Sequence, residues 1–367
     1  YTLSLHDALP ILVAAAGVVD QQGGRVTSGV DRLEEPVDAL RPGQVGGQNR
    51  RRRNLFGQCA QPVFAPGDQQ QVEAARRQLA LDLEEFSLTH LNAHDSGATA
   101  LGLDLRRRLG IPLVLTRRIA SPLRRNPLSR RKYSPRRLDG VIAVSETVRD
   151  VMVRGGYPAA RIQVVGDGVD VAALARIPAE PEFRAPFGTD FLVGGLGSLT
   201  PKKNWMLMVR AAEILARESF PVQWLLAGDG PDRAALEAAI GRAGLADRFH
   251  LLGFRADAAR LLRQLDALCF PSRMEGASVT VREAMALGVP VVAADAPGVV
   301  ESLAGHGWVS GADDPQALAD HVRQALQDAG LRQARIAAAR RHAQAHYDYE
   351  TTVAGTLAAY AALGGRR

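Results

Sequence analysis

Cysteines and long apolar segments are scarce in this chain of 367 residues. Cys59 and Cys269 are its only cysteines, which excludes a disulfide framework and a metal site with the spacing of cysteine ligands. This scarcity favours a reducing compartment. The apolar run Leu9–Val19 is too short to cross a bilayer, and no basic flank precedes it as in a signal peptide. We therefore expect a cytoplasmic protein without a membrane span.

Most of the chain alternates short apolar runs with amphipathic segments. Hydrophobic residues make up 46% of it, enough for two domains with cores of their own. Strands are expected at 88–94, 112–116, 140–145, 161–165, 191–197, 222–227, 249–252, 266–270 and 289–294. Helices are expected at 72–86, 98–109, 146–154, 205–217, from 231, and at 279–287, 315–328, 331–345 and 349–363. This alternation predicts an α/β fold with doubly wound parallel sheets.

Residues 171–190 interrupt the alternation, because they contain several prolines and show no clear period. We interpret them as a linker. The expected domains are then 67–178 and 188–346, with a last helix in 347–367.

The stretch from Pro271 to Asp295 carries the strongest chemical signal. It predicts a loop, a helix and a buried strand, with Glu275 in the loop and Glu283 eight positions later on the helix. Each carboxylate can accept two hydrogen bonds from a vicinal diol. Gly276 lets the backbone approach a ligand closely, and Ser278 caps a helix whose first N–H groups attract an anion. A nucleotide-sugar carries two diols on either side of its phosphates. The pattern therefore favours a nucleotide-sugar site over the alternative, in which two solvated glutamates flank an ordinary turn.

The spacing of Glu275 and Glu283 matches the E-x7-E motif of glycosyltransferase family 4, and the chain resembles that family over roughly residues 87–362. The resemblance implies a GT-B fold, in which two Rossmann-like domains face each other across a cleft. It implies transfer of a sugar from a nucleoside diphosphate-sugar to an acceptor hydroxyl with retention of configuration. Glu275 would contact the donor sugar and Glu283 the ribose. No cofactor and no metal are implied.

The resemblance also implies roles for the loop that follows the strand at 191–197. In the family this loop carries an arginine after a glycine and a lysine five residues later, and both contact the diphosphate. Here Ser198 follows Gly197 in place of the arginine, while Lys203 fits the lysine and Lys202 can compensate. The alternative is that both lysines lie exposed at the start of a helix. We expect Lys203 and Glu275 to be catalytic. The remaining donor-site candidates are Gly228, Phe254, Gly276, Ala277, Ser278 and Val279, with Arg255 beside Phe254.

Candidates on the acceptor side come from the first domain. His94 follows the strand at 88–94, although a turn formed with Asp95 explains it equally well. Members of the family often have a histidine after the next strand, where this chain has Thr116, Arg117 and Arg118. Arg117 or Arg118 is therefore a candidate for binding a phosphate or an anionic acceptor.

Between Arg106 and Arg137 the chain has many basic residues and no acidic one. Residues 121–137 are also rich in proline and serine, which predicts a mobile basic loop. Such a loop suits anionic lipid or a phosphorylated acceptor, and thus a place at the inner face of the plasma membrane. The alternative is a solvated loop. Nucleic acid is disfavoured, because only Tyr133 offers an aromatic ring for stacking.

The first 66 residues are atypical. The chain starts at Tyr1 and its opening resembles translated sequencing adapter, so we expect the natural N-terminus to be missing or replaced. Glycine, glutamine and arginine dominate residues 20–70, which predicts loop or disorder. A strand at 11–16 followed by a glycine loop at Gly23-Gly24 is the other interpretation, and a wrong reading frame explains the same facts.

Two further functions fit parts of the pattern. A nucleotide-sugar epimerase of the same fold would need no acceptor, and a non-catalytic binding or scaffold protein would need no turnover. A nicotinamide dehydrogenase is disfavoured because no G-x-G-x-x-G follows the first strand. Among these we expect a retaining glycosyltransferase of cell-envelope or lipid-linked glycan synthesis.

Overall fold

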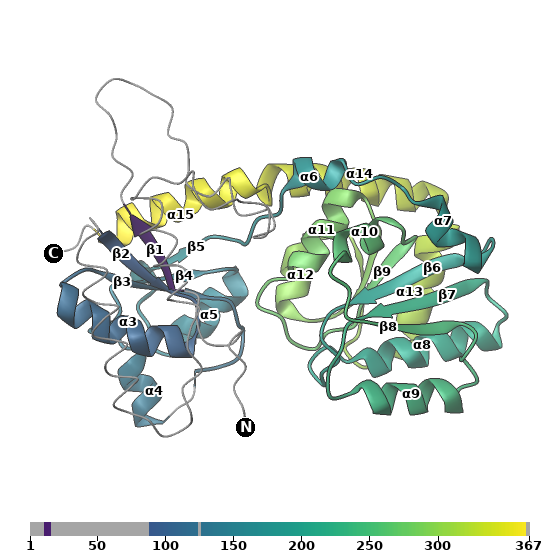
Figure 1. The fold of residues 1–367 in the computed structure, drawn as a ribbon, viewed down its shortest axis with the longest axis horizontal. Coiled ribbons are helices and arrows are strands. Elements are labelled where there is room, and N and C mark those ends of the chain that lie inside the picture. Colours follow the sequence, from purple (N-terminus) through teal and green to yellow (C-terminus); the bar gives the residue numbers. More distant parts are fainter. Residues whose placement is uncertain (1–10, 16–87, 124–125, 365–367) are drawn as a thin grey trace, which may run out of the picture. The chain divides into compact units, whose positions relative to one another are not determined.

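The computed structural model describes residues 11–15, 88–123 and 126–364 (Figure 1). The expectations for 1–10 and 16–87, including the helix at 72–86 and the glycine loop, lie outside these residues. The chain divides into two compact units. Of the described residues, one unit contains 11–15, 88–116, 126–141 and 360–364, and the other contains 117–123 and 142–359. The domain boundaries expected from the linker remain a prediction.

The first sheet has the strand order β1-β2-β3-β4-β5. Its strands are β1 (Ile11–Ala15), β2 (Leu88–Ala93), β3 (Leu113–Arg117), β4 (Gly140–Ala143) and β5 (Ile162–Val164). β2 and β3 are parallel, with Leu91 opposite Leu113, as the alternation predicted. β1 is antiparallel to β2, with Ile11 opposite Ala93. A strand at this place was one of the two interpretations of the N-terminal segment, and it adds an antiparallel edge beside the parallel pair of β2 and β3.

Side-chain caps fix the helices of this region. In α3 (Ser96–Leu109) Asp95 accepts a hydrogen bond from the N–H of Ala98 at 2.7 Å, and Gly110 ends the helix with φ 67°. In α5 (Glu146–Arg154) Ser145 has the same capping role. The loop expected at 121–137 was only partly right, because it contains α4 (Pro127–Lys132). Asn126 caps α4 and Pro127 starts it, a favourable pair at a helix N-terminus that the proline content concealed.

The second sheet lies wholly within the other unit and has the order β11-β10-β9-β6-β7-β8. Its strands are β6 (Phe191–Leu196), β7 (Val222–Ala227), β8 (Phe249–Gly253), β9 (Ala267–Phe270), β10 (Val291–Ala294) and β11 (Trp308–Ser310). All five neighbouring pairs are parallel. The chain runs outward from β6 to β8 and then returns to β9 on the other side of β6. At such a switch point the loops after β6 and β9 diverge, which leaves room for a ligand at the carboxyl ends of the strands.

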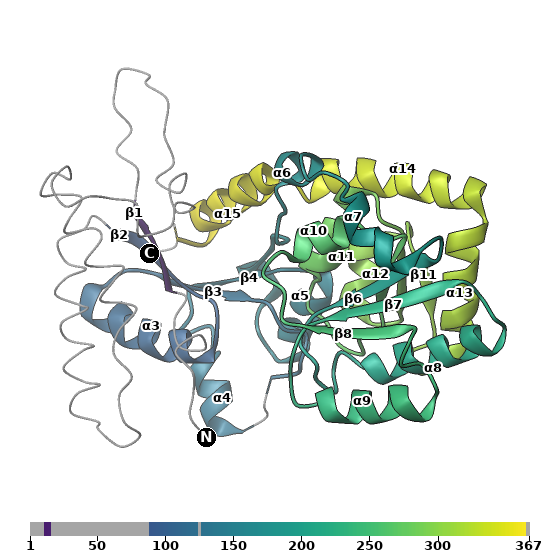
Figure 2. The same cartoon turned by 45° about the vertical axis from the view of Figure 1, so that its right-hand side comes forward.

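Helices cover both faces of this sheet (Figure 2). One face packs against α8 (Trp205–Arg217), α9 (Arg233–Arg242) and α13 (Pro315–Gln327). The other packs against α10 (Ala258–Arg263), α11 (Val279–Leu287), α12 (Pro297–Leu303) and α14 (Ala329–His346). The alternation of strand side chains separates the two cores, because Val193 points into the first and Leu192 into the second. Both residues are 0% exposed, so β6 is buried on both faces, as its continuous apolar run predicted.

The segment 171–190 is more regular than its composition suggested. It contains α6 (Val171–Ala175), capped by Asp170, and α7 (Pro181–Arg184), followed by a 3-10 turn at Ala185–Phe187. The sequence showed no period here because helices of about one turn are too short to produce one, and the interpretation of the segment as a linker stays a prediction. The last helix, α15 (Tyr349–Gly364), is continuous through both units, and its Tyr360 hydroxyl accepts a hydrogen bond from Asn92 at 2.7 Å.

Candidate functional site

Two turns with tightly packed backbones form the carboxyl edge at β6 and β7. Gly197 and Gly228 end these strands with φ of 148° and 147°. A Cβ atom on Gly228 would collide with the carbonyl oxygen of Gly197, so only glycine fits there. The N–H of Gly197 donates to the carbonyl of Ala227 at 3.0 Å, which joins the two turns. This contact holds the loop from Gly197 to Asn204 at the switch point.

Lys203 and Glu275, the two residues expected to be catalytic, contact each other. The Nζ atom of Lys203 lies 2.6 Å from Oε1 of Glu275, and the side chains are only 21% and 14% exposed. The same ammonium lies 4.8 Å from the centre of the Phe270 ring. Because an ammonium has three N–H donors, Lys203 can hold Glu275 and still donate to a ligand. The structure thus brings together a cation from the β6–α8 loop and an anion from the β9–α11 loop.

Glu283 has a different environment from Glu275. It lies half-buried on α11, and burial raises the pKa of its carboxyl group. Within the described part of the chain its carboxylate makes no hydrogen bond or ion pair. A half-buried carboxylate without a partner is costly, and such groups are concentrated at binding sites. Glu283 is therefore a hydrogen-bond acceptor with free capacity.

The start of α11 has the expected cap. The Oγ atom of Ser278 accepts a hydrogen bond from the N–H of Val281 at 3.3 Å. N–H groups in the first turn of a helix have no partner inside the helix, and the helix dipole makes that end positive. Ala277 and Val279 flank this cap, as the sequence placed them.

Gly276 packs against protein backbone. A Cβ atom there would collide with the carbonyl oxygen of Arg118, and the Gly276 carbonyl accepts a hydrogen bond from Ser145 at 2.5 Å. The glycine was expected to let the backbone approach a ligand. The structure supplies another reason for it, the close approach of another segment of the same unit.

The remaining donor-side candidates are more exposed. The Ser198 carbonyl accepts a hydrogen bond from the Trp205 ring at 3.0 Å, and the Lys202 carbonyl accepts one from the N–H of Arg273 at 2.9 Å. The Phe254 side chain is 80% exposed, as a stacking surface for a base would be. Arg255 pairs with Asp257 at 2.6 Å, so its guanidinium is already engaged.

The acceptor-side candidates belong to different units of the chain. His94 belongs to the first unit, where it follows β2, and Asp95 rather than His94 caps α3. Arg117 is 6% exposed and donates to the carbonyl of Ser121. Arg118 is exposed and pairs with Asp167 at 3.0 Å.

Sequence reasoning missed three residues around this site. Asn204, between Lys203 and α8, adopts a left-handed conformation with φ 54°, which residues other than glycine and asparagine rarely do. Arg282 is 3% exposed and stacks on the ring of Tyr347 at 4.3 Å, and burial lowers its pKa. The third is Arg273, whose backbone N–H donates to the carbonyl of Lys202 and so joins the β9–α11 loop to the β6–α8 loop. A charged residue within an apolar helix was the available signal for Arg282; nothing local indicated the other two.

Two family models match the chain. The model described as "Glycosyltransferase Family 4" matches residues 33–173, and the model described as "Glycosyl transferases group 1" matches residues 190–328.

Curated relatives are glycosyltransferases by name. The chain is 30% identical over 286 residues to the lipopolysaccharide core biosynthesis mannosyltransferase LpcC of Rhizobium leguminosarum bv. viciae, covering 75% of this chain and 78% of the relative. It is 33% identical over 180 residues to the 2-deoxystreptamine glucosyltransferase of Streptomyces kanamyceticus, where the match covers 47% of this chain and 46% of the relative. The chain thus matches less than half the length of this second relative.

Solved structures show the same fold. Anabaena Alr3699/HepE in complex with UDP-glucose superposes with a TM-score of 0.70 at 24% identity, over 83% of this chain and 88% of that one. A glycosyltransferase from Rickettsia africae superposes with a TM-score of 0.73 at 15% identity, over 84% and 85%. The fold is therefore GT-B, with two Rossmann-like domains. This chain belongs to the family 4 glycosyltransferases.

No helix among the described residues combines the length and apolar character needed to cross a membrane. Nor does any group of three or more His, Cys, Asp and Glu residues in that part of the chain have an arrangement suited to a metal ion.

Proposed function

We propose that this protein transfers a sugar from a nucleoside diphosphate-sugar to an acceptor hydroxyl, with retention of configuration. One observation carries the proposal. A lysine-glutamate pair and a half-buried carboxylate without a partner lie on two loops and a helix at the switch point of a parallel sheet. In the family these positions serve the donor. The complexes of HepE with UDP and with UDP-glucose support a donor of the same class.

Each group of the donor has a matching group in the site. The ribose diol donates to the carboxylate of Glu283, which gains the hydrogen bonds that it lacks in the free protein. Lys203 and the N-terminus of α11 attract the diphosphate, because both are positive. Glu275 accepts hydrogen bonds from the hydroxyls of the transferred sugar while Lys203 fixes its orientation.

The chemical step leaves negative charge on the diphosphate, and the site is suited to stabilise that charge. The bond between the anomeric carbon and the phosphate oxygen breaks, and its electron pair stays on the phosphate. The acceptor oxygen then bonds to the anomeric carbon on the same face, and its proton moves to the departing phosphate. Since negative charge on the diphosphate grows during this step, Lys203 and the start of α11 interact more strongly with the transition state than with the bound donor.

The acceptor in our proposal belongs to cell-envelope or lipid-linked glycan synthesis. The name of LpcC supports this acceptor class. The basic residues of 121–137 also support it, because Arg131 on α4 and Arg136 shortly after α4 are both exposed. A peripheral position at an anionic membrane surface would bring such an acceptor to the enzyme.

A thermal-shift screen tests the donor directly. UDP-, GDP-, ADP- and dTDP-sugars are each added to the wild-type protein and to Glu283→Gln. A ligand that binds only the folded state raises Tm in proportion to the logarithm of its concentration over Kd. We expect at least one donor to raise Tm of the wild type and to have little effect on the variant. If no nucleotide-sugar raises Tm, the proposal is wrong. Turnover that needs an added acceptor then separates a transferase from an epimerase.

A further inference from the structure

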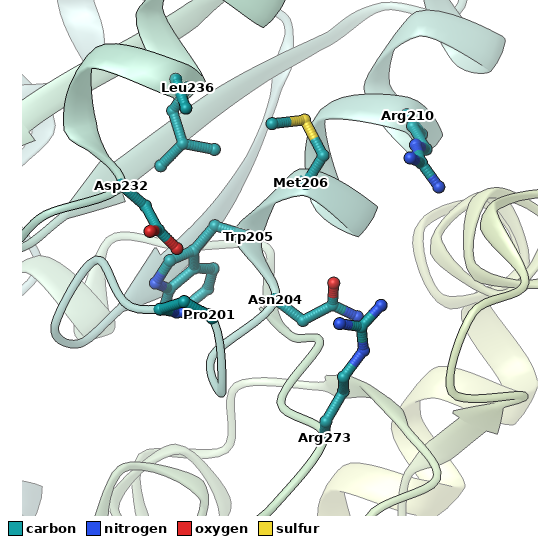
Figure 3. A pocket seen from close by; sticks show the side chains of 9 residues that line it. Pro201, Asn204, Trp205, Met206, Arg210, Asp232, Leu236 and Arg273 are labelled. Carbon is teal, nitrogen blue, oxygen red and sulfur yellow. The ribbon is translucent and has the colours of Figure 1, made fainter.

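A pocket lies beside the turn at Lys202–Asn204, and none of the predicted donor residues lines it. It has a volume of about 290 Å³ and lies between the start of α8, the start of α9 and Arg273 of the β9–α11 loop (Figure 3). Pockets for small ligands begin at roughly this size, about 300 Å³. The volume suits a ligand of one ring with a few substituents, much smaller than a nucleotide-sugar.

The lining of the pocket defines the chemistry of its ligand. Trp205, Met206 and Leu236 provide apolar walls. Arg210 and Arg273 provide cations, whereas Asp232 provides an acceptor on another side of the opening (Figure 3). A ligand that satisfies all three features has an apolar body, an anionic group and a hydroxyl or amine donor.

Both guanidinium groups are open to an anion. Arg210 is exposed and forms no hydrogen bond or ion pair with any residue that the structure describes. Arg273 pairs with Asp313 at 2.5 Å, but the two side chains are 50% and 62% exposed. Ion pairs that water reaches so freely contribute little, so a ligand can displace or share this one. The planar guanidinium fork matches phosphate and carboxylate oxygens, which adds geometric selectivity.

The pocket is joined directly to the residues of the donor site. Asn204 lines it and follows Lys203 in the chain, and its side-chain amide donates to the carbonyl of Ala312 at 3.2 Å. Arg273 also lines it, and its backbone N–H donates to the carbonyl of Lys202 at 2.9 Å. A ligand touching Asn204 and Arg273 therefore acts on both loops that hold the Lys203–Glu275 pair.

We propose that this pocket is an effector site for a small organic anion, and that its ligand changes the affinity of the donor site through the turn at Lys202–Asn204. The anion is a phosphate or a carboxylate on an apolar body that carries a hydroxyl or amine. This effector site is separate from the proposed sugar transfer, so the binding of the anion can be measured without turnover.

Calorimetry of the full chain tests the site, with phenyl phosphate as the probe and inorganic phosphate for comparison. Each titration is made with and without a saturating nucleoside diphosphate. We expect phenyl phosphate to bind under both conditions and more tightly than inorganic phosphate. Arg210→Ala and Arg273→Ala should each raise its Kd about tenfold or more, since a hydrogen bond to a charged group is lost. Met206→Trp, which fills the pocket, should abolish binding.

Arg217→Ala is the matched control. Arg217 lies at the other end of α8, is 74% exposed and pairs with Glu213, so its removal should leave the probe's Kd unchanged. The proposal is overturned if phenyl phosphate does not bind to the wild type or binds equally to all variants. Loss of binding in the presence of nucleoside diphosphate would also overturn it, because the probe would then occupy the donor site.

The coupling between the pocket and the donor site through Lys202–Asn204 is measured separately. The Kd of the nucleoside diphosphate is determined with and without phenyl phosphate, and the Kd of phenyl phosphate with and without the nucleoside diphosphate. Coupling must change both by the same factor, and we expect a factor of about five or more. If the Kd of each ligand is the same with and without the other ligand, the link is disproved. A failure of the proposed donor chemistry would instead show as absent nucleoside diphosphate binding with phenyl phosphate binding intact.

Discussion

Lys203 donates a hydrogen bond to Glu275 across 2.6 Å, and this contact joins two loops separated by 72 positions in the chain. In the proposed donor site the pair supplies the cation and one of the two carboxylates in a fixed relation. Because both side chains are mostly buried, neither can turn away into water at low cost. This arrangement leads to separate expectations for the lysine, the two glutamates and the surface around them.

Lys203→Ala should lower kcat more than it raises KM. The reason is that charge on the diphosphate grows as the bond to the sugar breaks, so the lost interaction is strongest in the transition state. We expect a loss of about 10- to 100-fold in kcat, from 1.5–3 kcal/mol for a charged hydrogen bond. Arg217→Ala is the control, because Arg217 is 74% exposed at the far end of α8 and pairs only with Glu213 among the described residues. Steady-state kinetics that show an unchanged kcat for Lys203→Ala would remove this lysine from the mechanism.

Lysine labelling offers an independent check of the same site. The chain has only three lysines, Lys132, Lys202 and Lys203, so modification by an amine reagent can be followed at each by mass spectrometry. A nucleotide-sugar that covers the site should protect Lys203 and leave the labelling of Lys132 unchanged. Equal protection of all three lysines would indicate a general effect on the protein rather than contact with Lys203.

Burial of Glu283 leads to a pH-dependent effect on stability. Its pKa is raised, so the folded state disfavours the charged carboxylate. Below the ordinary pKa of a glutamate both states are protonated and no cost arises. As the pH rises through the raised pKa, the folded state has to ionise a half-buried group, and stability falls. Glu283→Gln should therefore raise Tm of the free protein at pH 8 but change it little at pH 4. A Tm difference that shrinks as the pH rises would contradict this account.

The exposed side chains of Arg131 on α4 and Arg136 shortly after it should promote contact with anionic membranes. Each basic residue near such a surface contributes about 1 kcal/mol, so removing two weakens binding by roughly 30-fold. Arg131→Ala with Arg136→Ala tests this, and Arg154→Ala, at the exposed end of α5, is the control. Co-sedimentation with anionic vesicles should fall for the double variant and with rising salt. Equal binding to neutral vesicles would refute the electrostatic origin.

The sequence was a good guide wherever a local signal ended an element. The bounds of α5, α8, α11 and β7 were predicted as the structure has them, because caps such as Ser145, Ser278 and Gly288 mark their ends. It failed where elements are short or hidden by composition. β11 spans Trp308–Ser310, too few residues for a period, and α12 begins at Pro297, which suggests a turn.

In the candidate site, too, the sequence predicted what neighbouring residues determine and missed what distant segments determine. The spacing of Glu275 and Glu283 could be found in the sequence because one loop and one helix carry both. Their different environments could not, since the partner of Glu275 comes from a distant loop. The pocket beside Asn204 was also beyond reach, because three separate elements form its walls.

The central claim is that the two glutamates hold different parts of one donor, and calorimetry with a nucleoside diphosphate and with its nucleotide-sugar tests it most directly. Glu283→Ala should weaken both ligands at least tenfold, because both contain the ribose. Glu275→Ala should leave the nucleoside diphosphate nearly unchanged and weaken only the nucleotide-sugar. Equal losses for both ligands in both variants, or no loss in either, would contradict the assignment on which the proposed function rests.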